Sequence, residues 1–232
     1  MKKGLTEIVF ILDRSGSMSG LENDTIGGFN SMIDRQKETT GETLISTVLF
    51  DDQMKVLHDR VPLEKIGKMT RNDYYVGGST ALLDAVGRAI GHINSVQKSL
   101  PEDERPEKTM FVITTDGQEN SSVEYSYEKI KKMVEKKQEK KHWEFLFLGA
   151  NIDAIGTAAG LGIKPNRSVN YISDGAGTTA NFKAVGKAVM AFRCAPCVAD
   201  ADAMLEGWDE EIVKDYKARK KNSRKFLKKV NL

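Results

Sequence analysis

The 232-residue sequence is poor in cysteine and proline, and each scarcity excludes a class of protein. Its two cysteines, Cys194 and Cys197, cannot cross-link a chain of this length, which excludes a disulfide scaffold and fits a reducing compartment, the cytoplasm. With 5 prolines, 20 glycines, 40% hydrophobic and 29% charged residues, the composition excludes a disordered or collagen-like chain. The length then fits one large folded domain, with or without an appendage.

A long hydrophobic run is also missing. The longest unbroken aliphatic or aromatic stretch covers residues 8–12, far below the roughly 20 residues that a membrane-spanning helix needs, so no membrane helix is expected. Lys2 and Lys3 precede this stretch, but Glu7 interrupts the region and no small-residue cleavage site follows. We therefore expect no secretory signal.

The charge is small overall but unevenly distributed. The formal net charge is +2, yet residues 214–232 contain nine Lys or Arg and one Asp, which leaves residues 1–213 with a net charge of −6. A broad basic surface for nucleic acid is therefore not expected on the main body. The basic segment and its flank have too few apolar and aromatic residues for a membrane helix or for base stacking. These residues are Ile212, Val213, Tyr216, Phe226 and Leu227. We interpret the segment as a docking or surface helix rather than a nucleic-acid or membrane site.

Buried-strand patterns alternate with helical patterns over most of the chain. Strands are predicted over residues 7–12, 43–50, 54–61, 108–114, 143–148 and 169–172. Helices are predicted over residues 20–38, 80–100 and 182–192, all approximate. Another helix is predicted from a capping box of Ser121 and Glu124 to about residue 140. A small helix is predicted after the strand at 143–148, ending at about residue 160. Because the 54–61 strand alternates polar and apolar residues, it suits an antiparallel edge. The order predicts an α/β fold: a Rossmann-like, doubly wound, mostly parallel sheet with one antiparallel edge strand and helices on both faces.

The main domain is predicted to cover residues 1–195. Residues 196–232 are predicted to form a basic helical C-terminal extension, with a helix beginning at about residue 206. From the net charge of +8 on residues 214–232, we expect deletion of residues 205–232 to spare metal binding.

Two acids directly follow two of the buried strands. Asp13 ends the first strand pattern and Asp116 follows the fourth, so the fold places both at the carboxyl edge of the sheet, where doubly wound proteins bind ligands. Ser15 and Ser17 lie in the loop after the first acid, and Thr80 opens a helix after a glycine pair. Five oxygen-bearing side chains without His or Cys suit Mg²⁺ or Mn²⁺ rather than Zn²⁺ or copper.

The spacing of these residues carries a resemblance to a known family. The segments are Asp13-Arg14-Ser15-Gly16-Ser17, Thr80 after Gly77-Gly78-Ser79, and Asp116 in Thr115-Asp116-Gly117. They resemble the metal-ion-dependent adhesion site of von Willebrand factor A (vWA) domains, of the intracellular bacterial type, over roughly residues 5–193. The resemblance implies that Ser15, Ser17 and Thr80 contact the metal directly or exchange with water, while Asp13 and Asp116 act partly through bound waters.

The function that this resemblance implies is binding without catalysis. A cation held mainly by neutral hydroxyls stays electrophilic, so a Glu or Asp of a partner protein can complete its octahedron. Relatives inside cells often work in multiprotein complexes, sometimes beside ATPases, so an assembly role is implied. Asp84, one helical turn after Thr80, either orients a ligand of the metal or is an ordinary exposed acid.

A Mg²⁺-dependent phosphohydrolase that uses Asp13 is the alternative function. Haloacid dehalogenase-type phosphatases also place an Asp after a first buried strand, but their motif needs a second Asp two residues later, where this chain has Ser15. A serine nucleophile needs a base, and His58, His92 and His142 are predicted to lie away from the site. The pair Cys194 and Cys197 has the spacing of redox and zinc motifs, but one pair alone favours a plain helix terminus.

Overall fold

The computed structural model describes the backbone of residues 1–230 and the side chains of residues 1–221. The strands are β1 (Lys2–Asp13), β2 (Thr43–Phe50), β3 (Met54–Pro62), β4 (Pro106–Thr115), β5 (Glu144–Ala150) and β6 (Ser168–Tyr171). The helices are α1 (Glu22–Lys37), α2 (Leu82–Ser99), α3 (Tyr127–Lys141), α4 (Ala154–Gly160), α5 (Gly175–Cys194), α6 (Val198–Met204) and α7 (Glu210–Val230). Short 3-10 helices are η1 (Gly16–Met18), η2 (Leu63–Lys65), η3 (Glu102–Glu104) and η4 (Pro165–Arg167).

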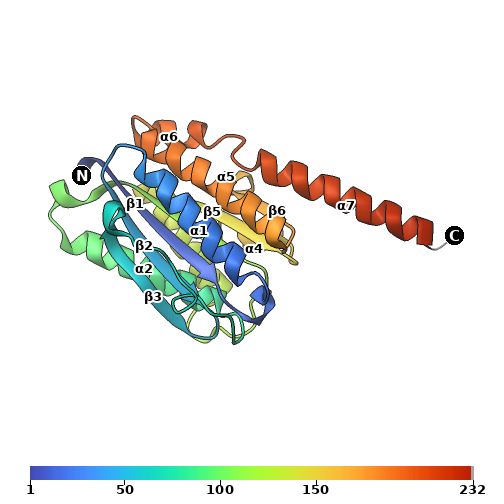
Figure 1. Ribbon diagram of the computed structural model, residues 1–232. Helices are drawn as coiled ribbons and strands as arrows, with labels where there is room; N and C mark the ends of the chain where they lie inside the picture. The colour runs from blue at the N-terminus through green and yellow to red at the C-terminus, as the bar shows by residue number, and fades with distance from the viewer. Residues whose placement is uncertain (231–232) are drawn as a thin grey trace.

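The strands form one sheet in the order β3-β2-β1-β4-β5-β6 (Figure 1). Of the strand pairs in the described chain, only β2 with β3 is antiparallel, and the others are parallel. The mostly parallel sheet with one antiparallel edge strand confirms the predicted fold class. The chain order reverses beside β1, which places the switch point between β1 and β4.

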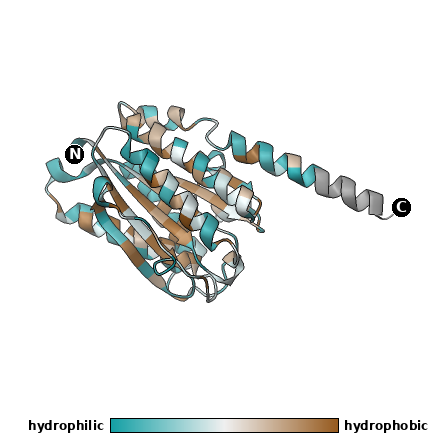
Figure 2. Cartoon of the chain, in the orientation of Figure 1, coloured by the Kyte–Doolittle hydropathy of each residue, from teal (hydrophilic) through white to brown (hydrophobic). Residues whose placement is uncertain are grey.

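Helices cover both faces of the sheet and divide the core in two. On β1, Ile8, Phe10 and Leu12 face the core that includes α1 and α5, whereas Val9 and Ile11 face the core that includes α2, α3 and α4. Because this central strand is buried on both faces, its sequence is continuously hydrophobic rather than alternating. Figure 2 shows the same layer as a hydrophobic sheet between helices with polar outer faces.

Strand β3 lies at the predicted antiparallel edge, but its burial does not alternate as the sequence pattern did. Its residues are only partly buried, and the Val56 side chain is 49% exposed. An irregular register with β2 occurs near His58, and Arg60 has a positive φ of 51°. These irregularities twist the edge and interrupt its row of unpaired backbone groups, which opposes pairing with another chain.

Two helical predictions need correction. Helix α3 begins at Tyr127 with Ser126 as its N-cap, which accepts a hydrogen bond from the Lys129 amide, so Ser121 and Glu124 form no capping box. The Ser121 amide instead donates to the Glu119 carboxylate, in the loop before the helix. Helix α6, of seven residues, was not predicted within the extension.

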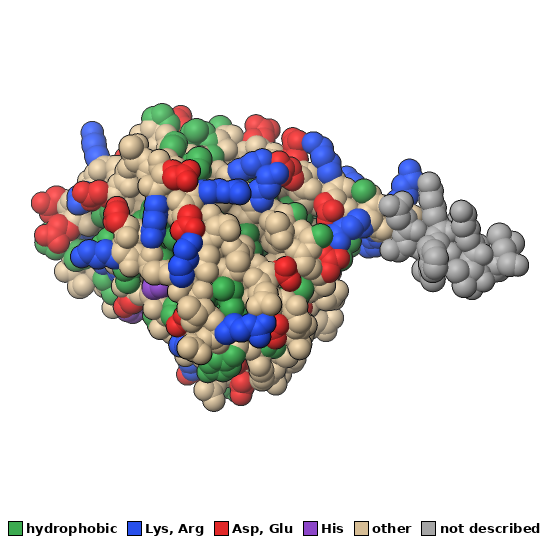
Figure 3. All heavy atoms as spheres, viewed as in Figure 1, with side chains coloured by type: hydrophobic (Ala, Val, Ile, Leu, Met, Phe, Trp, Pro, Cys, Tyr) green, Lys and Arg blue, Asp and Glu red, His purple; other side chains and the backbone are tan. Residues whose placement is uncertain are grey.

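The segment after residue 195 packs against the same core as α1 and α5. Leu205, Trp208 and Ile212 are buried there, although the boundary at residue 195 itself stays a prediction. Helix α7 passes β6 and α5 and continues beyond the sheet (Figure 1). Ion pairs fix its first half: Glu211 bonds Lys183 and Lys187, and Arg219 bonds Asp174 at 2.5 Å. Figure 3 shows acidic and basic side chains interspersed over this face.

The predicted apolar residues Phe226 and Leu227 lie outside the described side chains, as does much of the basic segment. Among the described residues, no helix has the length and hydropathy required to cross a bilayer.

Candidate metal centre

The carboxyl edge of the sheet brings together the predicted site residues from three separate segments. Asp13 is the last residue of β1, and Asp116 directly follows β4. These strands are parallel neighbours with Leu12 opposite Thr114, so the two acids leave the sheet side by side. The register of the central strands therefore determines where the acids lie.

Backbone hydrogen bonds hold the loop after β1 against the loop before α2. The Gly16 amide donates to the Gly78 carbonyl at 3.1 Å, and the Gly77 amide donates to the Arg14 carbonyl at 3.0 Å. Gly78 has a φ of +67°, and a Cβ built there would lie 2.1 Å from Oδ1 of Asp52. Glycine is thus required at this crossing, because a side chain would be strained and would clash.

Three hydroxyl groups face one space beside Gly117. The Ser15 and Ser17 Oγ atoms are 3.0 Å apart, and Ser17 Oγ donates to Oδ1 of Asp116. A Cβ built on Gly117 would lie 3.0 Å from Thr80 Oγ1, 3.1 Å from Ser17 Oγ and 3.8 Å from Ser15 Oγ. Four of the five predicted residues therefore surround a volume that any larger residue at position 117 would fill.

Thr80 is held in place by the loop that follows β4. Its amide donates to Oδ1 of Asn120 at 2.9 Å, and the Asn120 amide donates back to the Thr80 carbonyl at 3.0 Å. The next residue, Ala81, donates its amide to the Asp51 carbonyl at 2.8 Å. The Thr80 hydroxyl is therefore positioned by paired backbone groups on both sides.

Asp13 braces the site more than it lines it. Its Oδ1 accepts the Ser15 amide at 2.7 Å, its Oδ2 accepts the Thr115 hydroxyl at 2.6 Å, and its carbonyl accepts the Tyr74 hydroxyl at 2.6 Å. Burial raises the pKa of Asp13, hydrogen bonds from Ser15 and Thr115 oppose this rise, and the nearby Asp116 adds to it. A cation would favour the ionised form and so offset the cost of burying this carboxylate.

Ser173 contacts a predicted site residue, and the sequence pattern did not single it out. It lies between β6 and α5, and its Oγ donates to Oδ2 of Asp116 at 2.9 Å. Asp116 thus bonds a hydroxyl with each carboxylate oxygen, Ser17 on one and Ser173 on the other. A signal was present, since Ser173 closely follows a strand, as Asp13 and Asp116 do, but β6 is only four residues long.

Asp84 is neither a ligand-orienting group nor an exposed acid. It is buried, and its carboxylate accepts the backbone amides of Val123, Glu124 and Tyr125 at 2.9–3.0 Å. It fixes the loop that also carries Glu119, whose carboxylate accepts the Leu83 amide at the start of α2. Asp84 therefore supports the loop between β4 and α3 from outside the hydroxyl cluster.

The histidines and cysteines lie away from the site. His58 Nδ1 is 3.0 Å from Thr47 Oγ1, His92 Nε2 is 2.8 Å from Asp59 Oδ1, and His142 ends α3 with a left-handed backbone. Cys194 and Cys197 are exposed and unbonded to each other, beyond the end of α5.

The donor set at the rim fits a hard divalent cation. Within residues 1–221, no group of three or more His, Cys, Asp or Glu side chains gathers in a way that could hold a metal. A cation at this edge would therefore depend on the three hydroxyls together with Asp116 and, through water or hydroxyl, Asp13. Oxygen ligands of this kind suit Mg²⁺ or Mn²⁺, and Mg²⁺ ordinarily keeps several waters.

The fold is that of a vWA domain, a mostly parallel α/β sheet with one antiparallel edge strand. Proximal thread matrix protein 1 from the mussel byssus, with a zinc-occupied MIDAS motif, matches with a TM-score of 0.53 and 18% identity over 81% of this chain and 46% of that protein. The pilus adhesin SpaC from Lactobacillus rhamnosus GG in its open conformation has a TM-score of 0.60 and 10% identity, over 82% and 30% of the two chains. A von Willebrand factor type A protein from Catenulispora acidiphila matches with a TM-score of 0.52 and 13% identity, over 80% of this chain and 42% of that protein.

Because the sequence identities are low, these likenesses show a shared fold and nothing beyond it. No family model matches the sequence, and neither does any curated protein. The chain spans less than half the length of each of the three proteins, so their activities as whole molecules are not carried over. The neighbours confirm the vWA resemblance at the level of fold, while the intracellular bacterial type stays a prediction.

Proposed function

We propose that this chain is a metal-dependent protein-binding module without catalytic activity. Ser15, Ser17 and Thr80 would hold Mg²⁺ or Mn²⁺, with Asp13 and Asp116 completing the site directly or through water. The observation that carries the proposal is the convergence of three hydroxyls and the Asp116 carboxylate on the space beside Gly117. The zinc-occupied MIDAS motif of the mussel neighbour supports a divalent cation in this fold.

The charge distribution around that space favours an acidic partner. Asp116 contacts the hydroxyl cluster through Ser17 Oγ, whereas the side-chain oxygens of Asp13 accept the Ser15 amide and the Thr115 hydroxyl. A divalent cation there would keep net positive charge, and Ser17 is exposed, so one side is open to a ligand. A Glu or Asp side chain of a partner protein would then be the sixth ligand, as a charge-assisted contact.

The same geometry weighs against the phosphohydrolase alternative. Asp13 is 1% exposed and both of its carboxylate oxygens are engaged, whereas a phosphoryl acceptor must reach the substrate. His58 and His92 contact Thr47 and Asp59, and His142 ends α3, so none of them serves as a base for Ser15 or Ser17. We therefore infer a binding role, in the cytoplasm and within a multiprotein complex that could include an ATPase.

The decisive experiment measures metal affinity and partner capture together. Titration calorimetry should show Mg²⁺ or Mn²⁺ binding to the wild type, and Thr80→Ala and Asp116→Ala should each weaken it by about tenfold or more. Asp103→Ala, an exposed acid in η3, is the matched control and should change nothing. Retained affinity in both site variants would contradict the proposal.

Partner binding is tested by affinity capture with and without chelator. Proteins that depend on the metal should be lost on adding EDTA and from the Thr80→Ala column alike. Phosphoester turnover that requires Mg²⁺ and disappears in Asp13→Asn would instead support the alternative enzyme.

A further inference from the structure

Five lysines line a groove between α2 and α3, on the face of the sheet opposite α1 and α5. The groove encloses about 250 Å³ and has Ile90, Gly91 and Met133 among its lining residues. We call this hollow the lysine groove. Its lysines are Lys98 from α2 and Lys136, Lys137, Lys140 and Lys141 from α3. Two helices thus contribute positive charge to one hollow.

Within the described side chains, no ion pair holds these five lysines, although Lys140 and Lys141 also border a neighbouring hollow lined by Glu102 and Glu107. By contrast, Lys131 and Lys132 on α3 pair with Glu135 and Glu128. The groove lysines of α3 instead recur four residues apart, 136 with 140 and 137 with 141. Such like-charged pairs destabilise a helix, so helix formation alone does not account for them.

Capping of the helix ends does not account for them either. The Arg105 guanidinium donates to the Leu100 carbonyl at 3.0 Å and to the Lys98 carbonyl at 3.2 Å at the end of α2. At the end of α3, the Trp143 amide donates to the Lys137 carbonyl at 3.2 Å. The helix dipoles favour cations at these ends, but they do not bring lysines of two helices onto one groove.

One lysine is held in position within the groove. The Lys137 ammonium donates to Oδ1 of Asn94 and lies 4.8 Å from the centre of the Trp143 ring. Burial, with Lys98, Lys141 and Lys136 nearby, lowers the pKa of Lys137 to about 8. An anion in the groove would relieve this repulsion between the ammonium groups.

We propose that the lysine groove binds a compact anion that carries two or more phosphoryl groups. Each phosphate monoester brings a charge of about −1.5 to −2, and lysine recognises phosphate as a point charge without the planar fork that arginine offers carboxylates. The volume lies below the roughly 300 Å³ at which ordinary small-molecule sites begin, so the ligand is small. The phosphoryl groups come from a free metabolite or from a phosphoinositide headgroup.

The test uses the full chain with tripolyphosphate as the probe, in buffer with EDTA so that no divalent cation links the probe to the rim site. Titration calorimetry compares the wild type with the triple variant Lys98→Gln, Lys136→Gln and Lys140→Gln. All three side chains are exposed, so the fold is retained. The matched control removes the same charge from α7, with Lys217→Gln, Lys220→Gln and Lys221→Gln.

Each ammonium near an anion contributes about a fivefold gain in affinity, so the groove variant should bind about a hundredfold more weakly. The α7 variant should stay within about threefold of the wild type. Cosedimentation with phosphatidylcholine vesicles, with and without phosphatidylinositol bisphosphate, separates the two sources. Vesicle binding that is lost in the groove variant indicates a headgroup, and tripolyphosphate binding alone indicates a free ligand.

Three results would overturn the inference. These are no tripolyphosphate binding by the wild type, equal losses in the groove and α7 variants, and tighter groove-dependent binding of a single-stranded oligonucleotide than of tripolyphosphate. Because EDTA removes divalent cations, this test does not involve the rim metal site. Its outcome therefore leaves the proposal on partner binding untouched.

Discussion

At the scale of single residues, Asp116 depends on neighbours from two different loops. Ser17 reaches one carboxylate oxygen from the loop after β1, and Ser173 reaches the other from the loop after β6. Ser173 therefore fixes the rotamer of an acid that we propose to act at the metal, without itself joining the three converging hydroxyls. Such supporting hydrogen bonds are worth a substantial part of metal affinity in proteins.

Ser173→Ala should weaken Mg²⁺ or Mn²⁺ binding by about tenfold while leaving thermal stability nearly unchanged, because it frees Asp116 to leave its position. Titration calorimetry checks the affinity. Ser31→Ala, at an exposed position on α1, is the control. Unchanged affinity in Ser173→Ala would mean that Asp116 needs no such support.

Asp84 shows how a single buried acid makes stability depend on pH. Burial alone would raise its pKa, but amides of Val123, Glu124 and Tyr125 and the charge of Arg88 together hold the pKa below its ordinary value. The ionised Asp84 therefore contributes fully to the free energy of unfolding above the unfolded-state pKa of about 3.9. This contribution is lost as the pH falls through the lower folded-state pKa.

Asp84→Asn should lower the free energy of unfolding by about 1–3 kcal/mol at pH 7, because the carboxamide accepts fewer of the three amides. The gap to the wild type should narrow below about pH 3.9, where the wild-type acid becomes protonated. Urea unfolding at several pH values measures it, with Asp103→Asn as the exposed control. A gap that stays constant down to strong acid would contradict this account.

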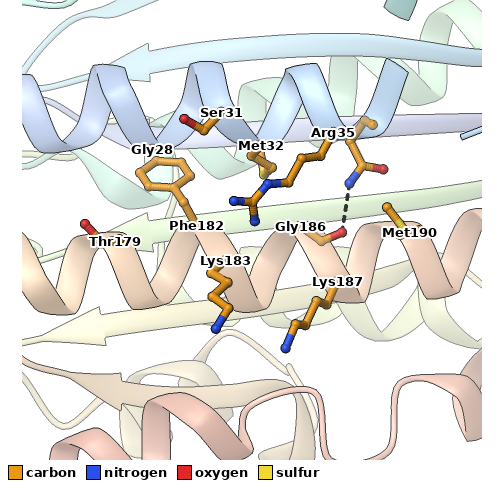
Figure 4. A pocket seen from close by; sticks show the side chains of 11 residues that line it. Gly28, Ser31, Met32, Arg35, Thr179, Phe182, Lys183, Gly186, Lys187 and Met190 are labelled. Atoms are coloured by element: carbon orange, nitrogen blue, oxygen red, sulfur yellow. Dashed lines mark hydrogen bonds between the residues drawn. The ribbon is translucent and has the colours of Figure 1, made fainter. Parts of the chain in front are cut away.

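At the scale of elements, α1 and α5 pack closely because glycines face large side chains. The Phe182 ring lies over Gly28, and Gly186 lies beside Met32 (Figure 4). The Gln36 amide also donates to the Gly186 carbonyl at 2.8 Å. A hollow of about 190 Å³ remains between the helices, but the contact at Gly28 itself has no spare room. These glycines set the distance between the two helices.

Gly28→Ala should destabilise the fold by about 1–3 kcal/mol, since a Cβ there would lie 2.3 Å from the Phe182 ring. Gly27→Ala, one residue earlier, meets nothing within 4 Å and should stabilise by up to about 1 kcal/mol through helix propensity. Thermal and urea unfolding of the two variants give the comparison. If both variants were stabilised, the close packing inferred here would be wrong.

At the scale of the whole molecule, the chain beyond residue 195 is built into the core that α1 and α5 share. The Trp208 side chain is 9% exposed, and its indole Nε1 donates to the Asn166 carbonyl at 3.0 Å. The buried Arg167 bonds Glu144 and Asp202, which ties α6 to β5. Deletion from residue 205 would therefore remove core side chains as well as basic ones.

Trp208→Ala should lower the free energy of unfolding by about 3–5 kcal/mol, because it opens a large cavity and leaves the Asn166 carbonyl without its donor. Met204→Ala, where the side chain is 43% exposed, should cost less than about 1 kcal/mol. Metal affinity of the folded variant should match the wild type, since the rim lies elsewhere. Chemical unfolding measures the stability and calorimetry the metal affinity. A Trp208→Ala variant as stable as Met204→Ala would show that Trp208 does not anchor the segment after residue 195 in the core.

The sequence by itself determined the sheet and the five candidate ligands. Continuous apolar strands such as β1 can only be buried on both faces, and an acid directly after such a strand must lie at the carboxyl edge. The alternation in the segment of β3 predicted the edge, because a strand of that pattern has only one face in the core. These features depend on the pattern of apolar and polar residues within short segments, so the sequence of each segment is enough to predict them.

Tertiary structure alone decided which distant groups serve those residues. Ser173 reaches Asp116, Asp84 turns away to hold three amides, and Lys98 joins the lysines of α3, although nothing in their local sequence specifies these partners. Trp208 likewise becomes part of the core only through contacts with distant segments, such as the bond from its indole to the Asn166 carbonyl. Side-chain contacts between segments far apart in the chain depend on the packing of whole elements, and one sequence does not display that packing as a pattern.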